Sequence, residues 1–332
     1  MRQDRRSQGS GRVNTPAVRF AARTVRVKAP GKINVSLDVG PLRPDGYHSV
    51  ASVYLAVSLY EEVAATSTET PGITVSLSPG STLDLDAVDI PLDASNLAYR
   101  AAAIMADVSE HATGVHLEIT KRVPVAGGMG GGSADAAATL LACDALWNSG
   151  LSREELAHLA AELGADVPFS LLGGTAVGLG VGDQLSPALA KAKTHWVLVT
   201  ADFGLSTPEV FRTLDRLREA EGVHADEPTG VDPHILAALR GGDADALSRI
   251  LVNDLQRASI ELAPSLRDTL GIGESHGAIA GIVSGSGPTV ALLADDSVAA
   301  EALAEDLQHQ GLSALAVHGP VPGARIISDT LL

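Results

Sequence analysis

The stretch with the clearest chemistry is PVAGGMGGGSADAA, residues 124–137, in which five of the six positions from Gly127 to Gly132 are glycine. Glycine lets backbone N–H groups approach a ligand closely and adopt positive φ angles. The helix predicted from Ser133 adds unpaired N–H donors and the positive end of its dipole. Together these features predict a phosphate-binding loop. Glycine richness alone also fits a connector or a packing turn, and Ser133 fits either a helix N-cap or a ligand to phosphate or magnesium.

Other nucleotide-binding and metal-binding motifs are missing from the sequence. Gly31-Lys32 is the only Gly-Lys pair and is followed by isoleucine, so no GxxxxGK[ST] loop occurs. Gly128-Met129-Gly130 begins a GxG pattern, but Ser133 stands where the third glycine of GxGxxG belongs. This difference argues against a Rossmann-type dehydrogenase. Neither HExxH nor paired CxxC motifs occur, so the sequence makes no case for zinc.

The overall composition limits the classes of partner. A chain of 332 residues with 45% hydrophobic residues is long enough for two domains. Its net charge of −16 argues against nucleic acid or an anionic membrane as the main partner. The single cysteine, Cys143, excludes an intrachain disulfide and predicts a reducing, cytoplasmic location. Residues 1–24 begin with a basic, polar run that lacks the apolar core of a secretory signal, and they are expected to be a disordered extension.

The elements that must position the loop alternate irregularly between strand and helix, which predicts an α+β fold. Residues 25–39 alternate and are rich in β-branched side chains, which predicts strand, tight turn and strand. Ser95 or Asn96 is expected to cap a helix that runs through Met105. Further strands are expected at 52–67, 72–79, 115–125, 174–187, 194–202, 277–295 (with a glycine turn) and 324–329, and further helices at 133–147, 152–164, 207–221, 232–240, 243–252 and 296–310.

Three motifs in a fixed order connect the glycine loop to a known family. They are APGKINVSLDV at 29–39, the glycine loop at 124–137 and VSGSGPTV at 283–290. With these motifs the chain resembles the GHMP kinases, which include galactokinase, homoserine kinase, mevalonate kinase and phosphomevalonate kinase. The resemblance implies an α+β, two-domain fold. An N-terminal ribosomal-protein-S5-like domain with the ATP loop would cover 25–186, and a ferredoxin-like C-terminal domain would cover 187–332, with the last strand free to return to the first domain.

Three shorter segments narrow the resemblance within this family. RPDGYHSV at 43–50, GADVPF at 164–169 and NDL at 253–255 are similar to the branch that phosphorylates a cytidine-diphosphate-linked methylerythritol in the non-mevalonate route to isoprenoid precursors. The resemblance implies transfer of the γ-phosphoryl group of ATP, with Mg²⁺, to the 2-hydroxyl of that small molecule. The net charge argues against a nucleic-acid or membrane partner, and the sequence leaves open whether the protein is a monomer or a homodimer.

Two alternatives to this function remain open at the level of sequence. One is another small-molecule kinase of the family, acting on homoserine or mevalonate. DGYH beside the first motif argues against it, because those substrates have no base to stack. The other is a catalytically inactive nucleotide-binding protein of the same fold, against which the presence of both Lys32 and Asp166 argues.

The resemblance places catalysis on two residues. Asp166 would be the general base that accepts the proton of the substrate hydroxyl. Lys32 would keep Asp166 ionised and stabilise charge on the transferred phosphoryl group. On spacing alone, Asp166 also fits a helix cap, since Asp-x-Pro often starts a helix, and Lys32 also fits an exposed turn lysine.

The resemblance also implies a substrate site. Asn34 shares a strand face with Lys32 and would hydrogen-bond the substrate. Tyr47 would stack on cytosine, His48 would read the edge of the base, and Phe211 would cover the other face with Thr207 nearby. The alternatives are turn positions for Asn34, Tyr47 and His48, and the buried face of a helix for Phe211.

The ATP phosphates would lie against the glycine loop, with Asn96 and Lys121 near adenosine or phosphate. Asn96 also fits a helix cap, and Lys121 also fits a solvated strand end. Ala134-Asp135 replaces the more usual Ser-Asn of the family, so that Asp135 adds negative charge close to the phosphates. The full predicted ATP site is Asn96, Lys121, Pro124, Val125, Ala126, Gly127, Gly128, Met129, Gly130, Gly131, Gly132, Ser133 and Ala134. No magnesium ligand is assigned from sequence.

Overall fold

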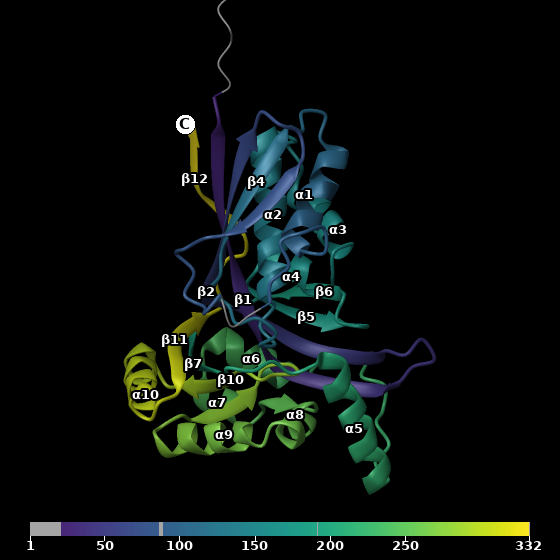
Figure 1. Cartoon of the computed structure of the whole chain (residues 1–332). Coiled ribbons are helices and arrows are strands. Elements are labelled where there is room, and N and C mark those ends of the chain that lie inside the picture. The colour runs from purple at the N-terminus through teal and green to yellow at the C-terminus, as the bar shows by residue number, and fades with distance from the viewer. Residues whose placement is uncertain (1–20, 86–88, 191, 332) are drawn as a thin grey trace, which may run out of the picture.

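The structure is a computed structural model that describes residues 21–85, 89–190 and 192–331 (Figure 1). The predicted extension at 1–24 lies outside the described residues except for its last four, of which Arg23 and Thr24 open the first strand. None of the helices in the described part of the chain combines the length and apolarity that a membrane crossing requires.

One mixed sheet forms the N-terminal half, with its long strands in the order β12-β1-β2-β4-β3. The helices α1 to α4 cover one of its faces (Figure 1). The bounds are β1 (Arg23–Leu42), β2 (His48–Thr68), β3 (Ile73–Leu77), α1 (Leu97–Val108), β4 (Gly114–Thr120), α2 (Gly131–Trp147), α3 (Arg153–Ala161), α4 (Asp166–Leu172), β5 (Thr175–Leu179), β6 (Gln184–Ala188) and β12 (Arg325–Leu331).

The prediction of strand, turn and strand at 25–39 is wrong, because β1 runs without interruption through this segment. Its register against β2 shifts between Pro30 and Lys32 and again between Asn34 and Ser36. Such bulges absorb residues that would otherwise break a strand, and they redirect side chains. The glycine of APGK allows close approach of β1 to Val123, because a Cβ at Gly31 would lie only 3.2 Å from the side chain of Val123.

The C-terminal half contains a second sheet with the strand order β11-β7-β10-β9, in which every neighbouring pair is antiparallel. This order is that of a ferredoxin-like β-α-β-β-α-β unit, so the predicted ferredoxin-like part is confirmed. The bounds are β7 (Thr194–Thr200), α5 (Thr207–Glu221), α6 (Pro233–Gly241), α7 (Ala244–Ser248), β8 (Val252–Asn253), α8 (Gln256–Leu262), α9 (Ser265–Ser275), β9 (Ala280–Val283), β10 (Val290–Ala294), α10 (Ser297–His309) and β11 (Ser313–Gly319).

Most helix predictions agree with the structure, and the differences lie at helix ends and in short helices. The Asn96 cap is confirmed, because its side chain accepts the N–H of Ala98. The helix predicted from Ser133 begins two residues earlier, since Gly130 takes a left-handed φ of 70° as N-cap. The helix predicted at 243–252 ends at Ser248, and α4, α8 and α9 were not predicted as separate helices.

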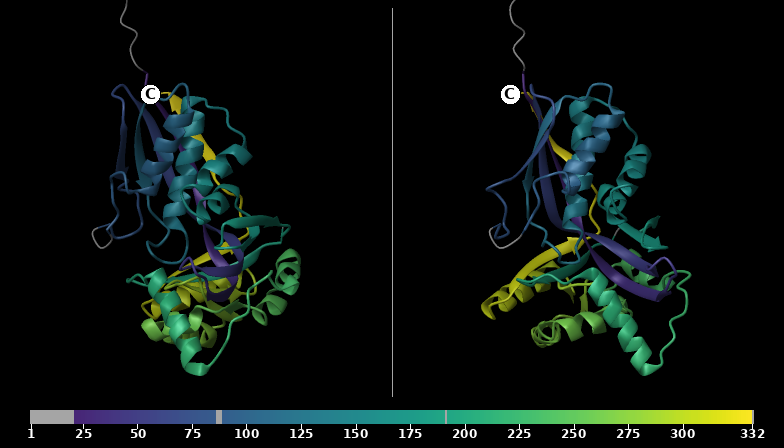
Figure 2. Two further views of the ribbon diagram at one scale, coloured as in Figure 1. Left: turned by 90° about the vertical axis from the view of Figure 1, so that its right-hand side faces the viewer. Right: turned by 45° about the vertical axis from the view of Figure 1, so that its right-hand side comes forward.

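The two sheets are joined by a shared apolar core. The C-terminal portion of β1 and the N-terminal portion of β2 extend past the first sheet and pack on the second, as the views in Figures 1 and 2 show. Ile33 and Leu55 of this hairpin are buried with Trp196 and Leu293 of the second sheet. On the opposite face, α9 and α10 cover the second sheet. The APGKINVSLDV motif on β1 therefore lies where both halves meet.

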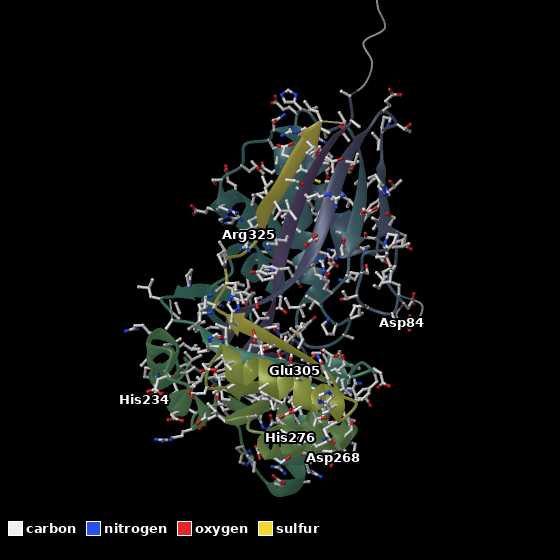
Figure 3. All side chains as sticks on the ribbon, turned by 90° about the vertical axis from the view of Figure 1, so that its left-hand side faces the viewer. Asp84, His234, Asp268, His276, Glu305 and Arg325 are labelled. Carbon is white, nitrogen blue, oxygen red and sulfur yellow. The ribbon has the colours of Figure 1, made fainter. Side chains whose placement is uncertain are left out.

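The last strand returns to the first sheet. β12 pairs antiparallel with β1 from Arg23 to Lys28, and Figure 3 shows it, with Arg325 labelled, beside β1 at the sheet edge. The side chain of Arg23 donates two hydrogen bonds to the carboxylate of Asp329 across this pair. We propose domains at 25–186 and 187–332, with β12 as a C-terminal strand that completes the first domain.

Candidate active site

The glycine loop is held by its carbonyl groups. The carbonyl of Met129 accepts the N–H of Lys32 at 3.0 Å, and that of Gly128 accepts the hydroxyl of Ser284 at 3.2 Å. The side chain of Met129 is fully buried in the shared core. By contrast, the N–H groups of residues 127–133 find no acceptor among the described residues. Unpaired N–H groups at the start of a helix of this length form an anion-binding site.

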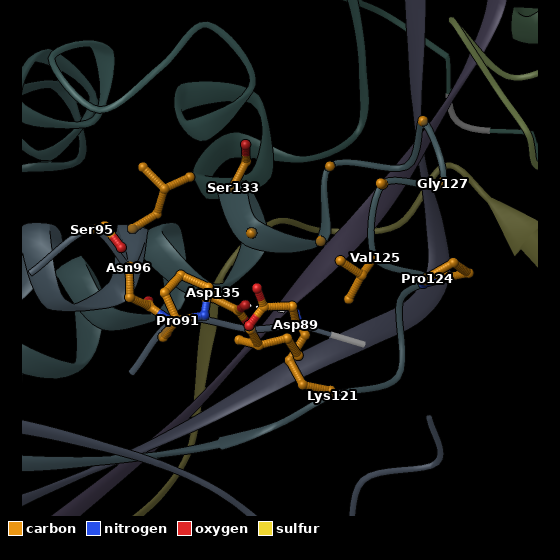
Figure 4. A pocket seen from close by; sticks show the side chains of 17 residues that line it. Asp89, Pro91, Ser95, Asn96, Lys121, Pro124, Val125, Gly127, Ser133 and Asp135 are labelled. Atoms are coloured by element: carbon orange, nitrogen blue, oxygen red, sulfur yellow. Dashed lines mark hydrogen bonds and ion pairs between the residues drawn. The ribbon is translucent and has the colours of Figure 1, made fainter. Parts of the chain in front are cut away.

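These N–H groups belong to the wall of a pocket of about 370 Å³. Residues 124–128 and 130–133 form one side of it, and residues 89–91 and 95–97 form another (Figure 4). Ser133 and Asp135 point to different sides of the first turn of α2. The hydroxyl of Ser133 has no partner among the described residues, whereas Asn96 uses both ends of its amide, on Ala98 N–H and on the carbonyl of Pro91. The pocket therefore combines free donors with a rigid opposite wall.

Lys121 lies in a buried ionic cluster below the loop. Its Nζ is 2.8 Å from Oε1 of Glu61 and 2.6 Å from Oδ2 of Asp135. Glu61 also accepts the N–H groups of Arg122 and Val123, at 3.0 and 3.1 Å. The alternative of a solvated strand end for Lys121 is wrong, since the residue is 2% exposed. The cluster fixes the chain directly before the glycine loop.

This cluster contains two carboxyl groups but only one ammonium group, so its charges would not balance if both carboxyl groups were ionised. Burial, together with the charge of Asp135, raises the pKa of Glu61 to about 8. Burial also raises the pKa of Asp135, whose Oδ1 is buried without a hydrogen-bond partner. Burial disfavours the charge of Lys121, but Asp135 and Glu61 outweigh this effect and raise its pKa. The folded protein therefore holds a proton in this cluster at a pH where unfolded carboxyl groups have lost theirs.

A second pocket, of about 210 Å³, lies on the other side of the loop. Gly128 and Gly130 line both pockets, so the loop is a shared wall between them. The second pocket contains the predicted catalytic pair, with Nζ of Lys32 3.9 Å from Oδ2 of Asp166. Asp166 is in the first turn of α4, but the helix has no side-chain cap bond. Its carboxylate is thus available to a ligand.

Lys32 is held by a chain of polar side chains on the β1–β2 pair. Its Nζ donates to Oδ1 of Asn34 at 2.7 Å, and Nδ2 of Asn34 donates to the hydroxyl of Ser52 at 2.7 Å. Ser52 in turn donates to the carbonyl of Ser36 at 2.6 Å. Lys32, Asn34 and Ser52 are buried. The predicted shared face of Lys32 and Asn34 is confirmed by this contact.

The predicted substrate residues are only partly brought together. Thr207 and Phe211 lie one turn apart on α5 and line the second pocket, and Phe211 contacts the ring of His48 at a centroid distance of 5.0 Å. His48 Nε2 lies 2.9 Å from Oδ1 of Asp215. Tyr47, in contrast, is 63% exposed and lines a separate pocket. Val181 lines both this pocket and the second pocket, so the two adjoin.

Several site residues were not found from the sequence. Glu61 and Tyr54 lie within the apolar run of β2, where a single sequence shows only strand periodicity. The NDL segment contains Asn253, whose role the sequence does not indicate. Its Nδ2 donates to the carbonyls of Val283 and Gly285, at 2.7 Å each, and supports the C-terminal glycine turn.

Comparisons with known proteins agree with this geometry. The family model described as GHMP kinases N terminal domain matches residues 96–174, and GHMP kinases C terminal matches residues 235–312. A 4-diphosphocytidyl-2-C-methyl-D-erythritol kinase of Pseudarthrobacter chlorophenolicus is 98% identical over 320 residues, which are 96% of this chain and 100% of that protein. The kinase of the same name from Arthrobacter sp. is 85% identical, with the same coverage of both chains.

The chain belongs to the GHMP kinase family. It is accordingly an ATP-dependent small-molecule kinase, as its motifs predict. A crystal structure of 4-(cytidine 5'-diphospho)-2C-methyl-D-erythritol kinase superposes with a TM-score of 0.73 at 31% identity, and covers 89% of this chain and 99% of its own. A homoserine kinase from Cytophaga hutchinsonii shares the fold, with a TM-score of 0.68 at 18% identity, covering 92% of this chain and 97% of its own.

The close fit of the loop against the C-terminal turn predicts the effect of Gly128→Ala on ATP binding. Gly128 has a φ of 74°, and a Cβ there would lie 2.2 Å from the carbonyl oxygen of Ser284. We expect at least a tenfold loss of ATP affinity in calorimetric titration. Gly150→Ala is the matched control, because Gly150 has a φ of 70° with nothing within 4 Å of its Cβ. Both variants carry similar backbone strain, of about 1 kcal/mol, so equal ATP affinity in the two would contradict the proposed fit.

The buried cluster predicts a pH dependence of stability. Because the folded state raises the pKa of Glu61 from 4.5 to about 8, it binds more protons than the unfolded state across that range. The free energy of unfolding should therefore fall as the pH rises from about 5 to 8, by up to about 1.4 kcal/mol per pH unit for one proton. Asp135→Asn leaves one ammonium facing one carboxylate and should flatten this slope in urea denaturation series. Parallel slopes for the two proteins would show that the cluster holds no extra proton.

Proposed function

We propose that this kinase transfers the γ-phosphoryl group of ATP to the 2-hydroxyl of 4-diphosphocytidyl-2-C-methyl-D-erythritol, in the synthesis of isoprenoid precursors. The 98% identity to a kinase of that name, over all of its length, is the observation that carries the substrate assignment. The two pockets with a common glycine wall support the reaction, because a phosphoryl group passes directly from one bound molecule to the other.

The residues divide into two groups on either side of the loop. The ATP phosphates bind the N–H groups of residues 127–133 and the hydroxyl of Ser133, and adenosine lies towards Asn96, within the pocket of Figure 4. The substrate hydroxyl enters the second pocket. There Asp166 accepts its proton while the oxygen forms a bond to the γ-phosphorus, and the bond from that phosphorus to ADP breaks. Lys32, whose Nζ lies 3.9 Å from Oδ2 of Asp166, stabilises the charge on the phosphoryl oxygens.

The cytidine part of the substrate extends towards α5 in this proposal. Phe211 stacks on one face of cytosine, and His48, oriented by Asp215, hydrogen-bonds its edge. Tyr47 covers the other face after its exposed side chain turns towards the adjoining pocket. Thr207 contacts the substrate beside Ser286, to which its hydroxyl is bonded at 2.8 Å. Asn34 contacts the substrate through its position beside Lys32.

Magnesium enters this proposal as part of the nucleotide. Among residues 21–85, 89–190 and 192–331, no group of three or more His, Cys, Asp or Glu side chains could hold a metal ion. Mg²⁺ would enter with ATP, with phosphate oxygens among its ligands, as is common for this ion. Its chemistry would be to neutralise phosphate charge.

The wider setting that we propose is a cytoplasmic enzyme, either a monomer or a homodimer, without a nucleic-acid or membrane partner. The single buried cysteine and the net charge of −16 support this setting.

The substrate assignment is tested by measuring ADP release with magnesium-ATP and three acceptors in separate reactions. We expect turnover with the cytidine-diphosphate-linked methylerythritol and none with homoserine or mevalonate, since those acceptors lack the base that Phe211 and His48 would bind. Turnover with either of the other alcohols would retain the fold and the phosphate loop but reject the base-binding assignment. ATP binding without turnover of any acceptor would favour an inactive nucleotide-binding protein.

The role of Asp166 is tested by Asp166→Asn, which removes the proton acceptor and keeps the shape of the side chain. We expect kcat to fall about 10²- to 10⁴-fold, while the affinities for ATP and acceptor change less than threefold. Asp268→Asn is the control, since Asp268 is exposed on α9, in the C-terminal domain (Figure 3). Full turnover in Asp166→Asn would remove this residue from the mechanism.

A further inference from the structure

Tyr54 occupies the catalytic pocket but has no part in the mechanism described so far. It lies on β2, is 6% exposed and lines the same pocket as Lys32 and Asp166. Its hydroxyl has no hydrogen-bond partner among the described residues. Burial and the nearby charge of Asp166 raise the pKa of this phenol, so it remains neutral. The residue is therefore an aromatic group placed beside two charged catalytic side chains.

The ring of Tyr54 faces the ammonium group of Lys32. Nζ of Lys32 lies 5.6 Å from the ring centroid, within the range of a cation–π contact. The same Nζ donates to Asn34 at 2.7 Å and stands 3.9 Å from Asp166, which is too far for a hydrogen bond. A lysine side chain is flexible, with rotatable donors on a long stem. The hydrogen bond to Asn34 alone would not fix the position of the ammonium group relative to Asp166. The ring of Tyr54 restricts the ammonium group from a second direction.

The surrounding chain leaves room for this ring. A Cβ at Gly178 would lie 2.4 Å from Cε2 of Tyr54, and one at Gly182 would lie 2.8 Å from its hydroxyl oxygen. Phe169 packs against the ring, at a centroid distance of 5.4 Å. The β5–β6 hairpin, which pairs with β2 at Tyr54 and Ala176, thus has glycine at both positions where a side chain would displace the ring. The backbone at Gly178 and Gly182 and the ring of Phe169 therefore limit where the ring of Tyr54 can lie.

We propose that Tyr54 is a positioning residue that holds the ammonium of Lys32 against Asn34 and Asp166 through the face of its ring. This inference rests on the catalytic role proposed for Lys32. The ring, and not the hydroxyl, is the functional part, because the contact is with the aromatic face. Displacing the ring should let the ammonium move by about an ångström, and misplacement of that size can lower a rate about 10²-fold.

The test compares steady-state kinetics of Tyr54→Leu and Tyr54→Phe. Tyr54→Leu removes the aromatic face and should lower kcat roughly 10- to 100-fold while leaving KM for ATP within twofold. Tyr54→Phe keeps the face and should retain kcat within threefold of the original enzyme. Gly178→Ala, which pushes on the ring without touching Lys32, should lower kcat in the same direction as Tyr54→Leu.

Two controls separate positioning from loss of structure. Leu156→Ala creates a cavity in the core between α3 and the N-terminal sheet and should lower the melting temperature without lowering kcat. In the background of Lys32→Met, Tyr54→Leu should cause no further loss of kcat, because the group that it positions is gone. Equal loss in Tyr54→Phe and Tyr54→Leu, normal kcat in Tyr54→Leu, or additive losses in the double variant would each overturn the proposal.

The outcome also distinguishes this inference from the function on which it rests. If Lys32→Met retains full activity, the catalytic role of Lys32 is wrong, and the positioning role of Tyr54 is wrong with it. If Lys32→Met is inactive but Tyr54→Leu has normal kcat, only the inference about Tyr54 is rejected.

Discussion

The arrangement of the whole site depends on one constraint, the fixing of the glycine loop by its carbonyl oxygens. Two of these carbonyls accept hydrogen bonds from Lys32 N–H on β1 and from Ser284 before the C-terminal glycine turn. A peptide group has its N–H and C=O on opposite sides, so a carbonyl directed into the protein turns the N–H of the same peptide outwards. The buried side chain of Met129 anchors the same segment in the core. The loop thereby presents free donors without being flexible.

The same hydrogen bonds bring together three motifs that lie far apart in the sequence. β1 supplies Lys32, whose N–H donates to the loop. Two residues later it supplies Asn34, whose N–H donates to the hydroxyl of Ser284 at 3.3 Å. The C-terminal turn is held in turn by Asn253 through two carbonyls. Both halves of the chain contribute residues to the second pocket, and the shared apolar core beneath the β1–β2 hairpin keeps the halves in contact. The two pockets adjoin because the glycine loop is a wall of both, and segments from both halves of the chain hold that loop.

Charge is distributed around the loop in a way that net charge does not reveal. Lys121, a buried lysine shortly before the loop in sequence, faces two buried carboxyl groups and stabilises the chain below the loop. The anion-binding donors are backbone N–H groups, which carry partial charge and need no counter-ion. Lys32, on the other side, has a single carboxylate within 4 Å in the described part of the chain, that of Asp166 at 3.9 Å. An acidic protein can bind a triphosphate in this way because the donors are local and fixed.

The sequence by itself determined the features that local chemistry encodes. The glycine content predicted the phosphate loop, and side-chain periodicity predicted most helices and strands. The order of the three motifs predicted the fold and the family. Only the tertiary structure decided which side chains face the site. The neighbours Glu61 and Glu62 look alike in sequence, yet one is buried against Lys121 and the other pairs with Arg122 at the surface. Alternation along β1 and β2 could not assign these faces, because three register shifts between the two strands change which face the residues beyond each shift occupy. The burial of Lys121, the exposure of Tyr47 and the placement of Tyr54 over Lys32 depend on contacts between distant segments, which no local pattern contains.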